Sequence, residues 1–174
     1  FTNVDLAEKQ RKKALETNGH ATGLIAQECH ERKIMFIHFS TDYVFNGFKK
    51  TPYLENDKPD PINYYGYSKL YGEQEIIKSN CYYFIFRISW LISINGKDFI
   101  KTILNKALNE NQIYVVNDQY GSPTSTALIS KVIKCLIKDY LSQNFWEKGI
   151  YHLTPNGKTS WFEIAKFVIN LANQ

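Results

Sequence analysis

The fold is decided by the stretch Ile34-Met35-Phe36-Ile37-His38-Phe39-Ser40-Thr41-Asp42. A nearly continuous apolar run ends here in three polar residues. A short apolar run without alternation is typical of a strand that is buried on both faces of a parallel sheet. Open α/β sheets bind ligands beyond the carboxyl ends of their strands, so the polar residues predict a functional edge.

Helices and strands are predicted to alternate along the rest of the chain. The residues from Val4 to about Arg32 have a helical composition that is interrupted near Asn18 and Gly19. Alternation of strands and helices predicts the α/β class, here a doubly wound, Rossmann-like parallel sheet with a small C-terminal α/β portion. Further helices are expected at 63–79, 98–109, 126–141 and 160–171, and further strands at 82–88, 113–116 and 149–153.

Composition and charge exclude several classes of protein. The 174 residues are 44% hydrophobic and 15% aromatic, which is enough apolar surface for a globular core. The net charge of +4 is spread along the chain and gives little reason to expect a nucleic-acid partner. Cys29, Cys81 and Cys135 are odd in number and far apart, so we expect no disulfide framework and no metal site. The absence of a disulfide framework favours a reducing cytoplasm. No apolar run reaches the roughly 20 residues of a membrane span, so membrane insertion is not expected.

A segment that the fold class requires is missing. Dinucleotide-binding folds open with a strand, a Gly-rich turn and a helix that holds the pyrophosphate. None of the nine glycines forms such a turn after a strand, and the chain starts with Phe1 and a helix. Either the chain binds no dinucleotide, or the binding half lies upstream of Phe1. Because the chain starts with Phe1 and not with Met, we expect an N-terminally truncated fragment or a trimmed product of a longer protein.

The pair Tyr65 and Lys69 is the strongest chemical signal. The two residues are four apart on a predicted helix and project from one face of it. A nearby ammonium lowers the pKa of a phenol, which can then protonate a carbonyl oxygen. Thr41 or Ser40 can polarise the same carbonyl. On spacing alone, the pair also fits an ordinary surface helix, and the two hydroxyls also fit a capping role.

Four stretches together resemble a known family. They are Ser40-Thr41-Asp42-Tyr43-Val44-Phe45, Tyr64-Tyr65-Gly66-Tyr67-Ser68-Lys69-Leu70-Tyr71-Gly72-Glu73, Arg87-Ile88-Ser89-Trp90 and Asn117-Asp118-Gln119-Tyr120-Gly121-Ser122-Pro123-Thr124. In this order they are similar to the dTDP-4-dehydrorhamnose reductase family of the extended short-chain dehydrogenase/reductase superfamily. The opening Phe1-Thr2-Asn3-Val4-Asp5 and the C-terminal Tyr151-His152-Leu153 fit as well, so the resemblance covers essentially the whole chain.

The resemblance implies a role for each matching residue. Tyr65 would be the proton donor, Lys69 its partner and ribose anchor, and Thr41 the hydroxyl that steadies the sugar carbonyl. Phe1 and Thr2 would join Tyr65 and Lys69 in binding the cofactor. Asp42, Tyr43 and Trp90 would line the sugar pocket with Thr41, and Arg87 and the loop 118–124 fall where the family builds its nucleotide-sugar site.

The resemblance also implies an activity, a cofactor and a domain division. The expected reaction is reduction of dTDP-4-dehydro-L-rhamnose to dTDP-L-rhamnose by NADPH or NADH, with no metal, no nucleic acid and no membrane as partners. A homodimer is compatible with it. Residues 1–90 would be the remainder of the cofactor-binding domain with the catalytic residues, and 91–174 mainly the portion that binds the nucleotide-sugar, interleaved with the first.

Alternative readings stay open for several residues and for the function. Trp90 also fits a core position, and Arg87 also fits a simple pair with a carboxylate. His38 and His152 lie in apolar runs and are expected to be satisfied core histidines. A nucleotide-sugar epimerase or dehydratase of the same superfamily, or a non-catalytic regulatory homologue, would share the Tyr65 and Lys69 pair.

Overall fold

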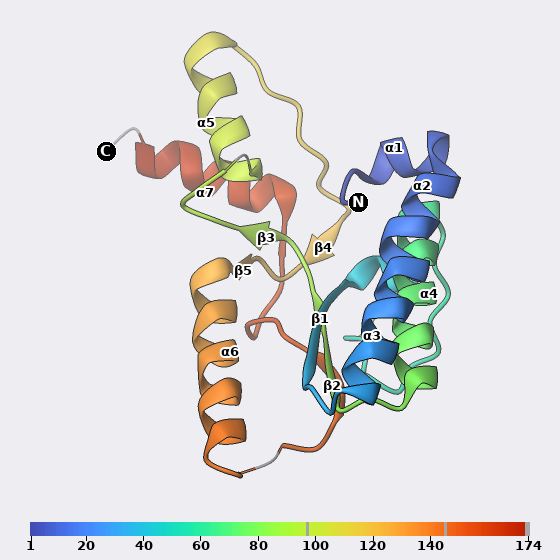
Figure 1. Cartoon of the computed structure of the whole chain (residues 1–174). Coiled ribbons are helices and arrows are strands. Elements are labelled where there is room, and N and C mark those ends of the chain that lie inside the picture. The colour runs from blue at the N-terminus through green and yellow to red at the C-terminus, as the bar shows by residue number, and fades with distance from the viewer. Residues whose placement is uncertain (97, 145, 173–174) are drawn as a thin grey trace. The chain divides into compact units, whose positions relative to one another are not determined.

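The computed structural model describes residues 1–96, 98–144 and 146–172. The chain forms two compact units (Figure 1). The first unit comprises Phe1–Ile88 and Glu147–His152, and the second unit comprises Ser89–Trp146 and Leu153–Gln174. Residues 147–152 therefore belong to the first unit, although residues of the second unit precede and follow them in the chain.

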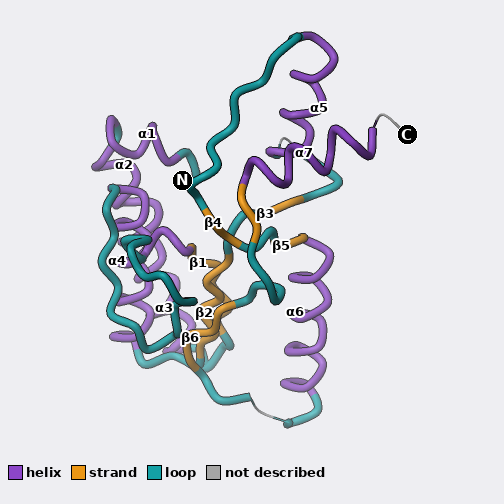
Figure 2. The backbone as a smooth tube through the Cα atoms, turned by 180° about the vertical axis from the view of Figure 1, so that it is seen from behind, coloured by secondary structure: helices purple, strands orange, loops and turns teal. Residues whose placement is uncertain are grey.

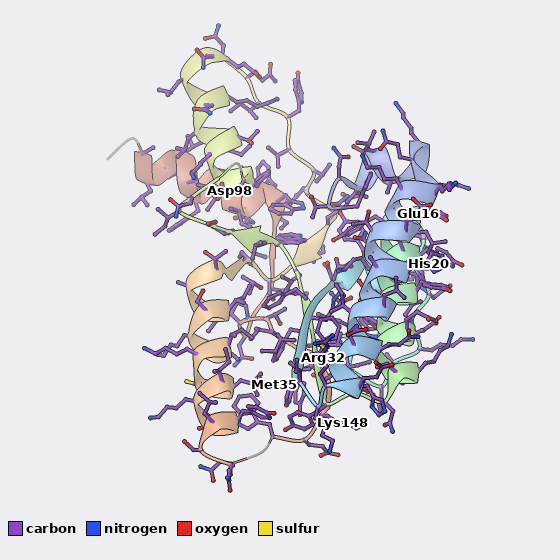
Figure 3. All side chains as sticks on the ribbon, viewed as in Figure 1. Glu16, His20, Arg32, Met35, Asp98 and Lys148 are labelled. Carbon is purple, nitrogen blue, oxygen red and sulfur yellow. The ribbon has the colours of Figure 1, made fainter. Side chains whose placement is uncertain are left out.

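The first unit is built on a three-stranded parallel sheet. The strands are β1 (Phe36–Thr41), β2 (Tyr83–Ile88) and β6 (Gly149–His152), in the order β1-β2-β6. Figure 2 shows them as neighbouring segments, and Met35 and Lys148, labelled in Figure 3, directly precede β1 and β6. The parallel α/β class is thus confirmed. Because β1 extends two residues beyond the predicted Phe39, it includes Ser40 and Thr41.

Helices of the first unit pack around α4 (Tyr64–Ser79). They are α1 (Val4–Lys9), α2 (Arg11–Leu15), the π-helical segment η1 (Glu16–His20) and α3 (Ala21–Glu31). In Figure 1, α3 and α4 run side by side, in agreement with their direct contacts.

The predicted interruption near Asn18 and Gly19 is confirmed, and it takes the form of the π-helical segment. A Cβ on Gly19 would lie 2.7 Å from the ring of Tyr71, and a Cβ on Gly72 would lie 2.2 Å from the carbonyl oxygen of Asn18. Only glycine permits so close an approach of the two backbones. A π-bulge at such a point is frequent near functional sites.

Side chains of the preferred types cap the helices. The Asn63 Oδ1 accepts a hydrogen bond of 2.8 Å from the Gly66 N–H and so starts α4. Asn80, with a φ of +57°, ends α4 in the left-handed conformation that asparagine tolerates. These local signals explain why the predicted helix 63–79 agrees with the structure to within one residue.

The described residues of the second unit form three helices and two small strand pairs. The helices are α5 (Phe99–Asn109), which starts at the cap Asp98 labelled in Figure 3, α6 (Thr126–Leu141) and α7 (Trp161–Ala172). Strands β3 (Leu91–Ile92) and β5 (Thr124–Ser125) pair in parallel, whereas β4 (Tyr120–Gly121) and β7 (Thr159–Ser160) pair antiparallel.

The predicted strand at 113–116 is wrong. This stretch has no regular secondary structure, and Tyr114 and Val116 are largely exposed. An apolar run becomes a strand only when a neighbouring strand accepts its hydrogen bonds, and none of the described residues does so here. Within the described ranges, no helix is both long and apolar enough to span a bilayer.

Candidate active site

Thr41 ends β1 at the carboxyl edge of the sheet. It is 6% exposed, and its Oγ1 accepts a hydrogen bond of 3.2 Å from the Tyr43 N–H. The same hydroxyl donates to the Asp42 Oδ1 at 3.1 Å. Thr41 therefore caps the short 3-10 helix η2 (Asp42–Val44), as the capping interpretation predicted, and it does so beside the phenol of Tyr65.

Tyr65 lies in the first turn of α4, beside the side chain of Thr41. Its ring packs edge-on against the ring of Tyr43, with 5.7 Å between the ring centres. Burial raises the pKa of Tyr65 above 10.0; the Thr41 hydroxyl opposes this rise, and the charge of Asp42 adds to it. The predicted lowering of this pKa by Lys69 is therefore wrong for this structure, because burial dominates.

Lys69 directs its ammonium at β1. Its Nζ donates to the carbonyl oxygen of Phe39 at 2.6 Å and lies 3.1 Å from the His38 Nε2. Burial lowers the pKa of Lys69 to about 8, against the charge of Glu73, which raises it. Burial and the charge of Lys69 lower the pKa of His38 to about 3. His38, on β1, therefore has a hydrogen-bond partner, as predicted for a satisfied histidine, and that partner is the candidate catalytic lysine.

Asp42 and Tyr43 complete the cluster around Tyr65. Burial raises the pKa of Asp42 to about 6, although hydrogen bonds from Thr41 and the backbone act in the opposite direction. Tyr43 is exposed and presents its ring to Tyr65. Four of the predicted site residues are therefore brought together at the carboxyl end of β1, and Lys69 lies one helical turn along α4 from Tyr65.

Phe1 is connected to the same helix, whereas Thr2 is exposed and forms no hydrogen bond within the described residues. The connection is Asn18, which is 6% exposed and which the sequence reasoning missed as a site residue. Its Nδ2 donates to the carbonyl oxygen of Phe1 at 3.0 Å and to the Ser68 Oγ at 3.0 Å. The feature of the sequence that could have indicated Asn18 was its polar side chain next to a glycine, at the predicted interruption of a helix.

Trp90 belongs to the second unit and packs against aromatic side chains. Its indole stacks on that of Trp161, with 3.7 Å between the ring centres, and Trp161 also contacts Phe99. A Cβ on Gly121 would lie 2.5 Å from the Trp90 ring, so glycine is required there. The backbone of Trp90 has a φ of +46°, a strained conformation for a bulky residue and one that is frequent at functional sites.

Within the loop 118–124, the carbonyl oxygen of Ser122 accepts a hydrogen bond of 2.9 Å from the Ser89 Oγ. The Ser122 hydroxyl in turn donates to the carbonyl oxygen of Gly157. These bonds fix the loop inside the second unit.

Arg87 forms an ion pair with a carboxylate, which was one of the two interpretations of this residue. It is 3% exposed and pairs with Glu73 within the first unit.

The Nε2 of His152 is buried without a hydrogen-bond partner in the described residues, so the prediction of a satisfied core histidine is wrong there. The described part of the chain contains no group of three or more His, Cys, Asp or Glu side chains that is arranged to hold a metal ion.

Comparison with known families decides where the chain belongs. A family model described as the RmlD substrate binding domain matches residues 1–174. The chain is a member of this family. The expected similarity of the four motifs to dTDP-4-dehydrorhamnose reductases is thereby confirmed.

Curated relatives of this RmlD domain carry the reductase name. The chain is 37% identical over 175 residues to the dTDP-4-dehydrorhamnose reductase of Sinorhizobium fredii, with 100% of the chain and 59% of that protein covered. It is 35% identical over 173 residues to the reductase of Burkholderia thailandensis, with 97% and 58% covered. The chain thus spans less than two thirds of the length of these relatives.

Solved structures agree with the RmlD assignment. The dTDP-4-dehydrorhamnose reductase of Bacillus anthracis in complex with NADP superimposes with a TM-score of 0.91 and 38% identity, covering 100% of this chain and 60% of that one. The dTDP-glucose 4,6-dehydratase of Streptomyces venezuelae has a TM-score of 0.82 at 16% identity, over 99% and 55% of the two chains. The second likeness shows a shared fold alone.

Proposed function

We propose that the full-length protein reduces dTDP-4-dehydro-L-rhamnose to dTDP-L-rhamnose with NADPH or NADH. The observation that carries this proposal is the cluster of Thr41, Tyr43 and Tyr65 at the carboxyl end of β1, with Lys69 one turn along the helix. Membership of the RmlD family and the NADP complex of the Bacillus anthracis relative support it.

The proposed chemistry assigns one task to each group. A bound nicotinamide supplies the hydride that reduces the sugar carbonyl carbon. Tyr65 donates its phenolic proton to the carbonyl oxygen, and Thr41 steadies that oxygen through its hydroxyl. Lys69 hydrogen-bonds the ribose of the cofactor and so places the nicotinamide beside Tyr65.

The donor set of the first unit fits the nicotinamide half of a dinucleotide. An ammonium, a phenol and a hydroxyl lie at the edge where open α/β sheets bind ligands. We further propose that Phe1 and Thr2 contact this half of the cofactor, and that Asp42, Tyr43 and Trp90 line the sugar pocket. In this proposal, residues 1–90 belong mainly to the cofactor-binding domain and 91–174 mainly to the portion that binds the nucleotide-sugar.

Replacement of the proposed acid tests the proposal. In the full-length protein, Tyr65→Phe is expected to lower kcat by about 10²- to 10⁴-fold, the usual effect of removing a general acid. Tyr67→Phe is the matched control, because Tyr67 is exposed on the same helix. The measurement is oxidation of NADPH and of NADH in the presence of dTDP-4-dehydro-L-rhamnose. Unchanged turnover in Tyr65→Phe would contradict the assignment.

Product analysis separates the reductase from a related epimerase. Net consumption of the reduced cofactor with formation of dTDP-L-rhamnose supports the proposal. A changed sugar with no net consumption of cofactor indicates an epimerase instead.

For the assembly and compartment, we propose a cytoplasmic homodimer. Analytical ultracentrifugation of the full-length protein and fractionation of the source cells test the two parts of this statement.

A further inference from the structure

The carboxylate of Glu73 is buried at the centre of a polar cluster in the first unit. Glu73 lies on α4 and is 1% exposed. Its Oε1 accepts a bond of 3.0 Å from the Arg87 Nε, and its Oε2 accepts one of 2.7 Å from the Arg87 Nη2. The Ser40 hydroxyl also donates to Oε1. Such a bidentate pair fixes the two partners in direction as well as in distance.

The cluster lies directly beside the catalytic edge of the sheet. Ser40 and Arg87 are partners in the register of β1 and β2, and His152 is the partner of Arg87 on β6. The next pair in the register is Thr41 and Ile88, with which β1 and β2 end. Glu73 therefore attaches α4 to the sheet one residue before the candidate catalytic threonine.

Glu73 is also connected to Lys69 through the helix. The two residues are four apart on α4, so they share a helix face. The Lys69 ammonium bonds the Phe39 carbonyl on β1, and Ser40, the next residue of that strand, bonds Glu73. Two successive residues of β1 thus hold two successive turns of α4.

We propose that Glu73 is a positioning residue for Lys69: held by Ser40 and Arg87, its carboxylate fixes α4 on the sheet and compensates the half-buried ammonium. The inference rests on the proposed function, since the position of Lys69 matters for catalysis only if Lys69 serves in the reaction. A Glu73–Arg87 pair that served the core alone would affect the stability of the fold and leave the titration of Lys69 unchanged.

The charged groups around Lys69 determine the direction in which a change at Glu73 shifts the pKa of Lys69. Lys69 is faced by His38 from β1 and by Glu73 from its own helix; Arg87 from β2 is paired with Glu73. Asp42 and Tyr43 from η2 act on Tyr65 instead. Since Glu73 raises the pKa of Lys69, its neutralisation lowers that pKa further. Activity that needs the ammonium is then lost at a lower pH.

The test compares Glu73→Gln with Ile76→Ala in the full-length protein. Ile76 is fully buried on the same helix, so its truncation weakens the core without changing a charge. We expect Glu73→Gln to lower kcat about 10- to 100-fold, as displaced catalytic groups do, and to move the alkaline limb of the pH profile to lower pH. Ile76→Ala is expected to lower the melting temperature while the pH profile stays that of the parent. Equal pH profiles in the two variants and the parent would overturn the inference.

Ser40→Ala keeps the test decisive if Glu73→Gln does not fold. This variant removes the bond from Ser40 and leaves the Glu73–Arg87 ion pair in place. A smaller movement of the alkaline limb in the same direction is expected, and a parental profile would overturn the inference.

An NMR titration of the Lys69 amine separates this inference from the proposed function. If the parent protein does not reduce the sugar, the proposed function falls. The inference is then judged by the Lys69 pKa in the parent, Glu73→Gln and Ser40→Ala proteins. A lower pKa in either variant supports the action of Glu73 on Lys69, and an unchanged pKa in both overturns it.

Discussion

The two units hold their candidate functional side chains in different ways. In the first unit, a hydrogen bond joins Thr41 to Tyr43, whose ring contacts Tyr65, and burial shifts the pKa of Tyr65, Lys69 and Asp42. In the second unit, Trp90 is held by the face of Trp161. Hydrogen bonds and charges depend on chemical identity, whereas stacked rings depend on volume and shape. A change of charge should therefore disturb the first unit, and a change of volume the second.

The largest effect is expected from removing the charge of Lys69. Lys69→Met in the full-length protein should lower kcat/KM about 10²-fold or more, because the ribose loses its cationic partner and the nicotinamide is no longer placed beside Tyr65. Lys78→Met is the control, since Lys78 on the same helix forms an exposed pair with Glu75. Steady-state kinetics decide the matter, and equal rates in the two variants would remove Lys69 from the mechanism.

In the second unit, a change of side-chain volume should have the larger effect on the free energy of unfolding. Trp161→Ala removes the partner of the Trp90 indole and should lower the free energy of unfolding by about 3 kcal/mol. Phe162→Ala is the control, because Phe162 is the adjacent and more exposed aromatic residue. Urea unfolding followed by tryptophan fluorescence gives both values. Equal losses would show that the stack does not carry the stability of this unit.

Asp42 should show the cost of a buried charge in the first unit. Because burial raises its pKa from 3.8 to about 6, the ionised carboxylate destabilises the fold above pH 6. This destabilisation disappears as the pH falls from 6 to below 4, since the Asp42 carboxyl is then protonated in the folded protein and carries no charge. Asp42→Asn should therefore stabilise the protein at pH 7 by up to about 3 kcal/mol and have little effect at pH 3.5. Thermal melts at the two pH values measure this difference, and an equal gain at both would contradict the assignment.

The smallest effect is expected from an exposed ion pair. Glu28 and Arg32 form a contact of 2.9 Å on α3, with both side chains more than half exposed. Glu28→Gln should change the free energy of unfolding by less than about 0.5 kcal/mol, because water screens such pairs. A loss in urea unfolding comparable to that of a buried pair would mean that burial is not what distinguishes Glu73 from Glu28.

The sequence by itself determined the helices and the three strands of the first unit, and it singled out Tyr65 and Lys69 as candidate site residues. The apolar run before Ser40 predicted β1, and the cap Asn63 with the spacing of Tyr65 and Lys69 predicted α4 and its chemistry. These features follow from interactions between residues close in the chain, which a linear pattern records. The four motifs in order also identified the family.

Only the tertiary structure decided which groups meet. It brought the ammonium of Lys69 to His38, paired Arg87 with Glu73, and tied Phe1 to Ser68 through Asn18. It also reversed the predicted shift of the pKa of Tyr65 and left residues 113–116 without a strand. Burial and contacts between distant residues produce these outcomes, and neither is written in the spacing of residues along one segment.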